Sequence, residues 1–122
     1  MKKLFIFGVF AFYLLPACSR ISSLTYINPN KTFVLGEGTH NAYSADIKNV
    51  GLNAVEVRTI DLGGNEKNLG DLKPGQKNSY EVLENTTVTF KNKGKLVSTA
   101  LAIKLNTSFN TRLSMGYKVN KD

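Results

Sequence analysis

The two side chains best suited to nucleophilic or metal chemistry, cysteine and histidine, each occur once in the 122-residue chain, as Cys18 and His40. A zinc site needs three or four ligands of this kind, and a blue-copper site needs two histidines and a cysteine. A serine hydrolase would have to use His40 as its base, and no serine stands in a Gly-x-Ser-x-Gly sequence. We therefore expect no catalytic residues, no metal site and no cofactor.

Pairs of carboxylates, which glycosidases use as acid and base, occur as Asp46 with Glu56 and as Glu81 with Glu84. The alternation of residues around them places these side chains on the outward side of predicted strands. No Asp-x-Asp-x-Asp-Gly sequence is present that would form a calcium loop. The spacing therefore favours a solvated surface over a catalytic pair.

The first 17 residues have the pattern of an export signal. Lys2 and Lys3 form a short positive region, and apolar residues follow from 4 to 15. Such a run rises about 18 Å as a helix, which is short of the roughly 30 Å hydrocarbon core of a membrane. The pattern predicts a cleaved signal peptide rather than a transmembrane span.

The sequence Leu-Pro-Ala-Cys at 15–18 resembles the lipobox of bacterial lipoproteins. The resemblance implies that signal peptidase II recognises Leu15 and Ala17 and cuts before Cys18, whose sulfur carries a diacylglyceryl group. Two or three acyl chains hold a small domain in a membrane essentially permanently. Because the second residue, Ser19, is not aspartate, the same resemblance implies a lipid-anchored protein of the cell envelope in the outer membrane.

The basic residues are dispersed along the chain. Loss of residues 1–17 removes Lys2 and Lys3 and lowers the net charge from +7 to +5. The remaining Lys and Arg run from Arg20 to Lys121 without a block of five, so no nucleic-acid stripe is indicated. The expected partners are the membrane, through the lipid, and an envelope protein or polysaccharide.

Beyond the signal segment, apolar residues alternate with polar ones at a period of two, and no window has a helical stripe. Lys-Pro-Gly-Gln at 73–76 predicts a type II turn, and Asn-Lys-Gly-Lys at 92–95 predicts a hairpin. A change of parity within 54–62 predicts a bulge near Thr59 or a strand covered on both sides. Among the clearest strands are 32–35, 42–48, 54–62, 96–105 and 113–119, and a first edge strand could begin at 24–27.

Seven to nine short strands without a helix predict an all-β fold, an antiparallel two-sheet, immunoglobulin-like sandwich. The stretches 47–51, 55–57 and 72–75 resemble the strand, turn and Leu-x-Pro-Gly pattern of small immunoglobulin-like adhesion modules on bacterial surface proteins. That resemblance implies a fold and no activity. The expected organisation is a signal peptide at 1–17, a lipidated Cys18 with a tether at 18–31, and one β-sandwich domain at 32–122.

Two segments are the expected contacts with a partner. Lys91, Lys93 and Lys95 flank the predicted hairpin, where they would either meet a polyanion or blunt edge pairing. Phe109 is a lone aromatic residue in a polar segment, and Arg112 follows it closely.

The function that these patterns favour is a non-enzymatic, lipid-anchored accessory or interaction module of the cell envelope. It would bind a protein or a surface polymer through loops or a sheet edge. Two alternatives remain open, a small envelope enzyme or enzyme inhibitor and a purely structural envelope lipoprotein. An enzyme would have to depend on His40, whereas a binding module would tolerate its replacement.

The anchor makes a direct prediction for the chain expressed in bacteria. The protein recovered from membranes is expected to lack residues 1–17 and to carry acyl chains, and Cys18→Ser is expected to lose both the acyl mass and the membrane association. Intact-mass spectrometry of fractionated cells measures both properties. A soluble, unacylated wild-type product would contradict the lipobox interpretation.

Overall fold

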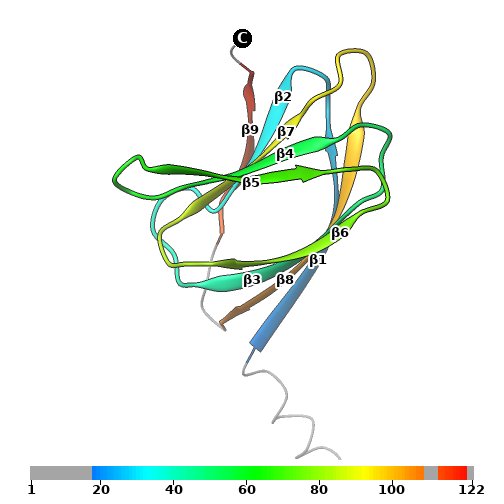
Figure 1. The fold of residues 1–122 in the computed structure, drawn as a ribbon. Coiled ribbons are helices and arrows are strands. Elements are labelled where there is room, and N and C mark those ends of the chain that lie inside the picture. The colour runs from blue at the N-terminus through cyan, green and yellow to red at the C-terminus, as the bar shows by residue number, and fades with distance from the viewer. Residues whose placement is uncertain (1–17, 109–112, 121–122) are drawn as a thin grey trace, which may run out of the picture.

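A computed structural model describes residues 18–108 and 113–120. Within these ranges the chain forms two layers of β-sheet and no helix (Figure 1). It follows that no described helix is long and apolar enough to cross a membrane. The strands are β1 (Cys18–Ile27), β2 (Lys31–Leu35), β3 (Tyr43–Asn49), β4 (Val55–Ile60), β5 (Glu66–Leu72), β6 (Lys77–Val82), β7 (Thr87–Asn92), β8 (Thr99–Ser108) and β9 (Met115–Val119).

The strand order is that of a jelly roll. One sheet has the order β1-β8-β3-β6 and the other has the order β5-β4-β7-β2-β9. The antiparallel pairs β1 with β8, β2 with β7, β3 with β6 and β4 with β5 are nested, as in one long hairpin wound into a two-layer barrel. Strand β9 adds to the outer side of β2. The prediction of an all-β, antiparallel two-sheet sandwich is confirmed.

The expected immunoglobulin-like order is wrong. In that order, strands that follow one another in the chain often pair within one sheet. Here β4 and β5 form the only consecutive pair that stays in one sheet among the described strands, and the other connections between consecutive strands cross between the layers. The lengths and spacing of the strands are similar in the two folds, and the pairing partners that distinguish them lie far apart in the sequence.

Two local predictions are also corrected. The tether expected at 18–31 is instead β1 over most of its length, an edge strand that pairs with β8 along all of its residues, as the alternative prediction for 24–27 anticipated in part. The hairpin expected at 92–95 is a crossing between sheets, because β7 and β8 belong to different layers and β8 begins at Thr99. The signal segment 1–17 lies outside the described residues.

One prediction of local geometry is confirmed, and a second is confirmed only in part. At 73–76 the Gln76 amide donates to the Lys73 carbonyl oxygen at 2.9 Å, and Gly75 has a φ of 84°, as a type II turn requires. The register between β4 and β5 shifts between Val57 and Arg58, close to the position predicted for a bulge, but β4 itself pairs with β7 without a shift. The extra residue lies on the partner strand β5, where Gly70 has a φ of 97°.

The core lies between the two sheets and is built from alternate residues of each strand. Side chains such as Ile47, Val57 and Leu101 are fully buried. Phe90 is also fully buried, and its ring centroid lies 6.1 Å from that of Phe33 and 6.5 Å from that of Tyr80. The period-two pattern of the sequence therefore determines which face of each strand is buried.

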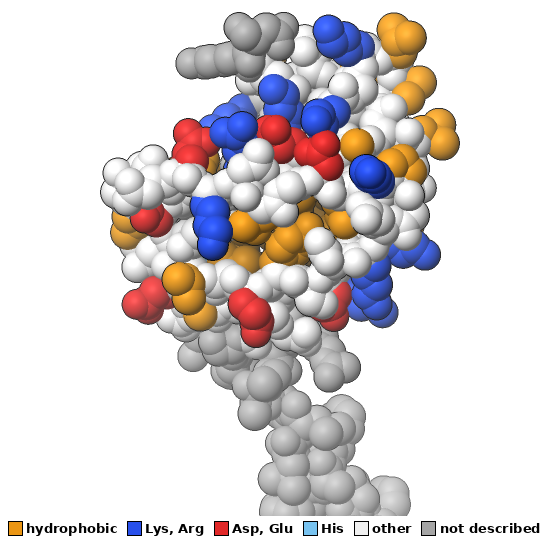
Figure 2. All heavy atoms as spheres, in the orientation of Figure 1, with side chains coloured by type: hydrophobic (Ala, Val, Ile, Leu, Met, Phe, Trp, Pro, Cys, Tyr) orange, Lys and Arg blue, Asp and Glu red, His pale blue; other side chains and the backbone are white. Residues whose placement is uncertain are grey.

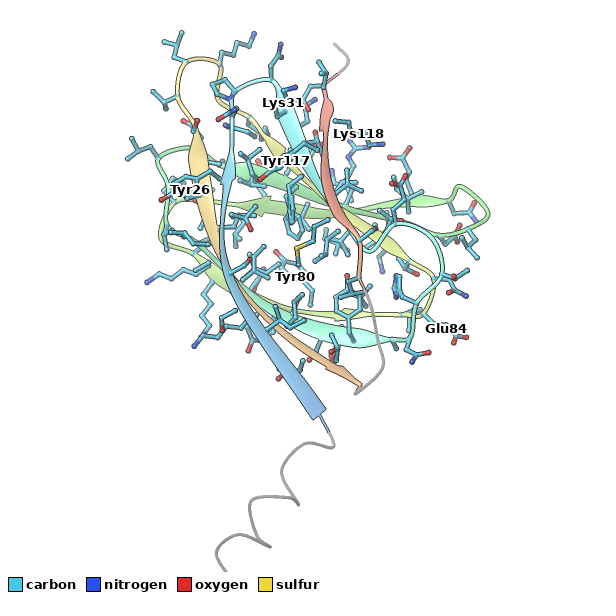
Figure 3. The ribbon with its side chains drawn as sticks, turned by 180° about the vertical axis from the view of Figure 1, so that it is seen from behind. Tyr26, Lys31, Tyr80, Glu84, Tyr117 and Lys118 are labelled. Carbon is cyan, nitrogen blue, oxygen red and sulfur yellow. The ribbon has the colours of Figure 1, made fainter. Side chains whose placement is uncertain are left out.

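The side of the sandwich between the edge strands β1 and β9 is closed by a polar contact. The Tyr117 hydroxyl of β9 donates to the Tyr26 carbonyl oxygen of β1 at 2.9 Å (Figure 3). The Tyr117 ring also packs against Phe33, with 5.5 Å between the ring centroids. This contact joins the edges of the two sheets and covers part of the core where no further strand of the described residues continues either layer.

The loops between strands gather at two ends. The loops 28–30, 50–54, 73–76 and 93–98 form one end, which we call the asparagine end. The loops 36–42, 61–65 and 83–86 lie at the other, which we call the histidine end. Figure 1 places the β1–β2 and β7–β8 loops at the top and the Cys18 end of β1 at the bottom.

Tyr43 makes a prediction about alkaline pH. Its side chain is 5% exposed, its hydroxyl has no hydrogen-bond partner among the described residues, and burial raises its pKa. An unfolded tyrosine ionises at about pH 10. Between that pH and the raised pKa the unfolded state binds fewer protons, so the free energy of unfolding falls as the pH rises.

We expect Tyr43→Phe to reduce this alkaline loss and to keep neutral-pH stability within about 1 kcal/mol of wild type or above it, because an unpaired hydroxyl is removed. Urea unfolding at about pH 8 and about pH 11 measures the difference. Phe33→Leu, a core change without a titrating group, serves as the control and should keep the wild-type pH dependence. An equal alkaline loss in Tyr43→Phe would argue against Tyr43 as its source.

Candidate functional site

The loops of the asparagine end are held by a buried asparagine at the end of β3. Asn49 is fully buried, and its Nδ2 donates to the carbonyl oxygens of Asn53 at 2.7 Å and Leu72 at 2.9 Å. Its Oδ1 accepts from the Gly51 amide at 3.0 Å and from the Thr99 hydroxyl at 3.1 Å. One amide thus joins the β3–β4 loop to β5 and β8.

A second buried asparagine plays the same part at the end of β7. Asn92 is 2% exposed, and its Nδ2 donates to the carbonyl oxygens of Ile27 at 2.9 Å and Val97 at 3.2 Å. Its Oδ1 accepts from the Gly94 amide at 2.8 Å and from Asn53 Nδ2 at 3.2 Å. Because Asn53 Nδ2 also donates to the Val97 carbonyl at 2.7 Å, the β3–β4 and β7–β8 loops are bonded directly to each other.

Glycines allow this close packing. A Cβ atom at Gly51 would lie 2.1 Å from Thr99 Oγ1, and one at Gly94 would lie 2.1 Å from Asn53 Nδ2. Both distances are far below any ordinary contact, so a side chain at either position would displace the hydrogen-bonded groups. The conformation of the two loops therefore depends on these glycines as well as on the asparagines.

Apolar side chains project from these two bonded loops. Leu52 is 76% exposed and Leu96 is 91% exposed, and Val50 and Val97 are each close to half exposed. Figure 2 shows hydrophobic side chains gathered at the upper right, where Figure 1 places the β7–β8 loop. We call the surface formed by Val50, Leu52, Leu96 and Val97 the apolar loop surface.

Lysines flank the apolar loop surface. Lys93 Nζ lies 2.8 Å from Asp71 Oδ2, and this hydrogen bond and charge raise the pKa of Lys93. Lys95 is exposed and forms no ion pair with any described acidic residue. The surface thus combines exposed leucines with positive charge and a backbone fixed by buried hydrogen bonds.

The structure separates the predicted contact residues. Lys93 and Lys95 belong to the crossing loop, but Lys91 lies on the outer face of the five-stranded sheet, opposite Glu56 and Thr32. The positions Phe109 and Arg112 lie outside the described residues, as do the lipobox residues Leu15 and Ala17 of the predicted signal. Cys18 is the first residue of β1.

The apolar tips were not among the predicted contacts. Leu96 was assigned to a predicted strand, which in fact begins three residues later at Thr99. Leu52 lies between the predicted strands 42–48 and 54–62, and an apolar residue in this connection was the available signal.

His40 lies at the histidine end of the sandwich, where its ring and its backbone amide contact two loops. Its Nδ1 lies 2.7 Å from the Asn41 carbonyl oxygen and its Nε2 lies 2.8 Å from the Thr86 carbonyl oxygen. The His40 amide donates to Asn85 Oδ1 at 2.9 Å. These bonds join the β2–β3 and β6–β7 loops. Among the described residues, no three His, Cys, Asp or Glu side chains form a group that would hold a metal ion.

Comparison with known proteins supports the fold alone. No protein-family model matches the chain, and no curated protein matches its sequence. Solved structures similar to it include procruciferin, an 11S globulin from Brassica napus, with a TM-score of 0.52, 13% identity and coverage of 80% of this chain and 22% of that one. The capsular polysaccharide assembling protein CapF from Staphylococcus aureus gives a TM-score of 0.51 at 15% identity, with coverage of 73% of this chain and 25% of that one.

An 11S globulin from Wrightia tinctoria is similar at a TM-score of 0.53 and 12% identity, and 78% of this chain covers 22% of that one. This chain therefore spans a quarter or less of the length of each of these three proteins. At such identities the likeness extends to the β-sandwich and gives no information about activity.

The buried amide of Asn49 makes a prediction about stability. Asn49→Ala leaves the Asn53 and Leu72 carbonyls without this donor, and we expect it to lower the free energy of unfolding by about 3 kcal/mol. Asn28→Ala is a control at the same end, because the exposed Asn28 side chain accepts one bond, from the Ser98 hydroxyl. Its expected cost is below about 1 kcal/mol. Denaturant unfolding measures both values, and equal costs would show that the buried network has no special role.

Proposed function

We propose that this chain is a non-enzymatic lipoprotein of the bacterial cell envelope, anchored by a lipid on Cys18, that binds a partner protein through the apolar loop surface. The observation that carries the proposal is the combination, on bonded loops, of strongly exposed leucines with a rigid backbone. Loops that are already ordered lose little conformational entropy on binding, so their apolar area contributes more fully to affinity.

The position of Cys18 supports the orientation that this function needs. Strand β1 begins at Cys18 and is paired with β8 from its first residue, so a lipid on Cys18 would be attached to the fold without a flexible spacer. The asparagine-end loops lie at the opposite side of the molecule from the Cys18 end of β1 (Figure 1). A membrane-anchored domain in this orientation presents the apolar loop surface away from the lipid. The lipobox pattern and Ser19 favour the outer membrane as its location.

The chemistry of the surface favours a protein partner over a polysaccharide. Sugar-binding surfaces use aromatic platforms and dense hydrogen-bonding groups, whereas Leu52, Leu96 and Val97 offer aliphatic area. Protein interfaces usually have polar and charged residues at the border of an apolar centre, and Lys93 and Lys95 lie at this border here. A surface polymer remains the second candidate for the same loops.

The environment of His40 supports a non-enzymatic function. Both ring nitrogens face backbone carbonyl oxygens and the residue connects two loops, so the ring is already engaged in holding the histidine end. An inhibitor of an envelope enzyme would be a special case of the proposal, because inhibitors also present a rigid exposed loop. A purely structural lipoprotein would have no use for the exposure of Leu96.

Photo-crosslinking in living cells tests the proposal. A photoreactive amino acid at position 96 or 52 is expected to give an adduct with one discrete envelope protein, whereas the same amino acid at position 62 is expected to give none. Leu62 is the matched control because it is 66% exposed but lies in the β4–β5 loop of the histidine end.

The strength of the contact can be tested with Leu52→Asp in the chain that carries the crosslinker at position 96. We expect a tenfold or greater loss of the adduct, because burial of a leucine side chain is worth about 1.5–3 kcal/mol. The exposure of Leu52 means that folding is expected to change by less than about 0.5 kcal/mol. Equal adducts from positions 96 and 62 in acylated, membrane-bound protein would refute the proposed interface, and adducts of heterogeneous mass containing sugar would favour the polymer.

A further inference from the structure

The outer face of the four-stranded sheet carries a groove separate from the apolar loop surface. Its volume is about 450 Å³, and all four strands line it. One row of paired residues crosses the sheet, and it consists of Leu24 of β1, Ala102 of β8, Lys48 of β3 and Lys77 of β6. The small side chain of Ala102 between Leu24 and Lys48 accounts for the hollow. We call this surface the cationic groove.

The arrangement of charge around Lys48 and Lys77 is unfavourable for the protein alone. Lys48 and Lys77 are directly opposite each other on antiparallel strands, a position in which like charges repel. Lys104 also lines the groove, and none of the three lysines forms an ion pair within the described part of the chain. The one acidic residue of the groove, Asp46, lies opposite Lys104 and accepts a hydrogen bond from the Ser79 hydroxyl at 2.6 Å. The groove therefore has a net positive charge that an anionic ligand would neutralise.

Apolar side chains lie beside these charges. Leu24 is 55% exposed and Tyr26, two residues further along β1 on the same face, is 60% exposed. Figure 3 shows the Tyr26 side chain directed away from the space between the two sheets. Lysines combined with a tyrosine and a leucine on one exposed face are typical of surfaces that rest at the interface of an anionic membrane.

The position of the groove relative to Cys18 selects the membrane as its occupant. In Figure 1 the four-stranded sheet is the lower layer, and β1 descends from that layer to its Cys18 end. Cys18 and Leu24 belong to the same strand, β1, so a lipid on Cys18 would be attached to the sheet whose outer face carries the groove. A lipid on Cys18 would hold this face near the membrane surface at a high effective concentration, so weak electrostatic contacts would suffice.

We propose that the cationic groove binds the anionic head groups of the membrane in which Cys18 is anchored, and that this second contact fixes the orientation of the domain. The inference rests on the proposed lipid anchor but not on the proposed protein partner. It assigns to Lys48, Lys77 and Lys104 the role of contacting lipid phosphates, and to Leu24 and Tyr26 that of contacting the interfacial region between head groups and acyl chains.

The test uses the acylated protein reconstituted in nanodiscs. Cys18 is the only cysteine of the chain, and its sulfur is acylated, so a cysteine introduced by Ser22→Cys can be labelled selectively with a polarity-sensitive fluorophore. Ser22 lines the cationic groove, and the same label at Leu62→Cys, in the β4–β5 loop, reports on a surface away from it. Two disc compositions are compared, phosphatidylcholine alone and phosphatidylcholine mixed with phosphatidylglycerol.

The fluorescence emission of the label at position 22 is expected to shift to shorter wavelength in the discs that contain phosphatidylglycerol. The emission of the label at position 62 is expected to stay unchanged. The combined variant Lys48→Gln, Lys77→Gln, Lys104→Gln should abolish the shift. A control with the same loss of charge, Lys67→Gln, Lys73→Gln, Lys118→Gln, should keep it. Thermal unfolding of both variants shows that each is folded, and removal of the Lys48–Lys77 repulsion should leave the first at least as stable as wild type.

Three outcomes would overturn the proposal. The first is an unchanged label at position 22 in phosphatidylglycerol discs that retain acylated protein, which leaves the anchor intact. The second is a shift caused by soluble polygalacturonate and not by phosphatidylglycerol, which would assign the groove to an acidic polymer. The third is a protein without acyl chains, as measured by intact-mass spectrometry. This result would remove the proposed lipid anchor, and with it the membrane that the groove is proposed to contact.

Discussion

The hydrogen bonds of Asn49 and Asn92 allow the chain to cross between the two sheets at one end of the sandwich. A jelly roll takes the chain from one layer to the other after almost every strand, and each crossing removes backbone groups from the sheet ladders. Both asparagines end a central strand, β3 in one sheet and β7 in the other. Their buried amides donate to carbonyls on neighbouring loops and strands, so polar groups that would otherwise be buried without a partner are satisfied.

This constraint explains why the loops of the asparagine end are suited to recognition. Gly51 and Gly94 have no space for a side chain, and Asn53 joins the two loops through Val97. These hydrogen bonds fix the backbone of both loops against the end of the sandwich. The side chains between the bonded residues therefore have no position in the core and project into solvent. The exposure of Leu52 and Leu96 is therefore a consequence of the same network that stabilises the crossing.

Much of the fold was predictable from the sequence because local chemistry determines it. The period-two alternation identified most of the strands and the buried face of each one, and the Lys-Pro-Gly-Gln turn formed where its φ requirements predicted it. The strand order was not predictable, because β1 pairs with β8 and the two strands are separated by almost the whole domain. The same spacing of short strands fits an immunoglobulin-like order and a jelly roll, so the sequence pattern alone favoured the wrong one.

The candidate surfaces were harder to predict for the same reason. The cationic groove brings together Lys48, Lys77 and Lys104, and no pattern along the chain connects residues from three strands that become neighbours through pairing alone. Lys91, Lys93 and Lys95 are close in sequence and were expected to act together. They separate because Lys91 is still within β7, whereas the chain has left the sheet at Lys93.

The two proposed surfaces are compatible because β1 is a strand from its first residue. A lipid on a flexible tether would let the domain rotate freely, and neither surface would then have a fixed relation to the membrane. Since β1 is paired with β8 along its whole length, a lipid on Cys18 would restrain the four-stranded sheet directly. In that orientation anionic lipids beneath the sheet would relieve the repulsion between Lys48 and Lys77, and the apolar loop surface would stay free to bind a protein.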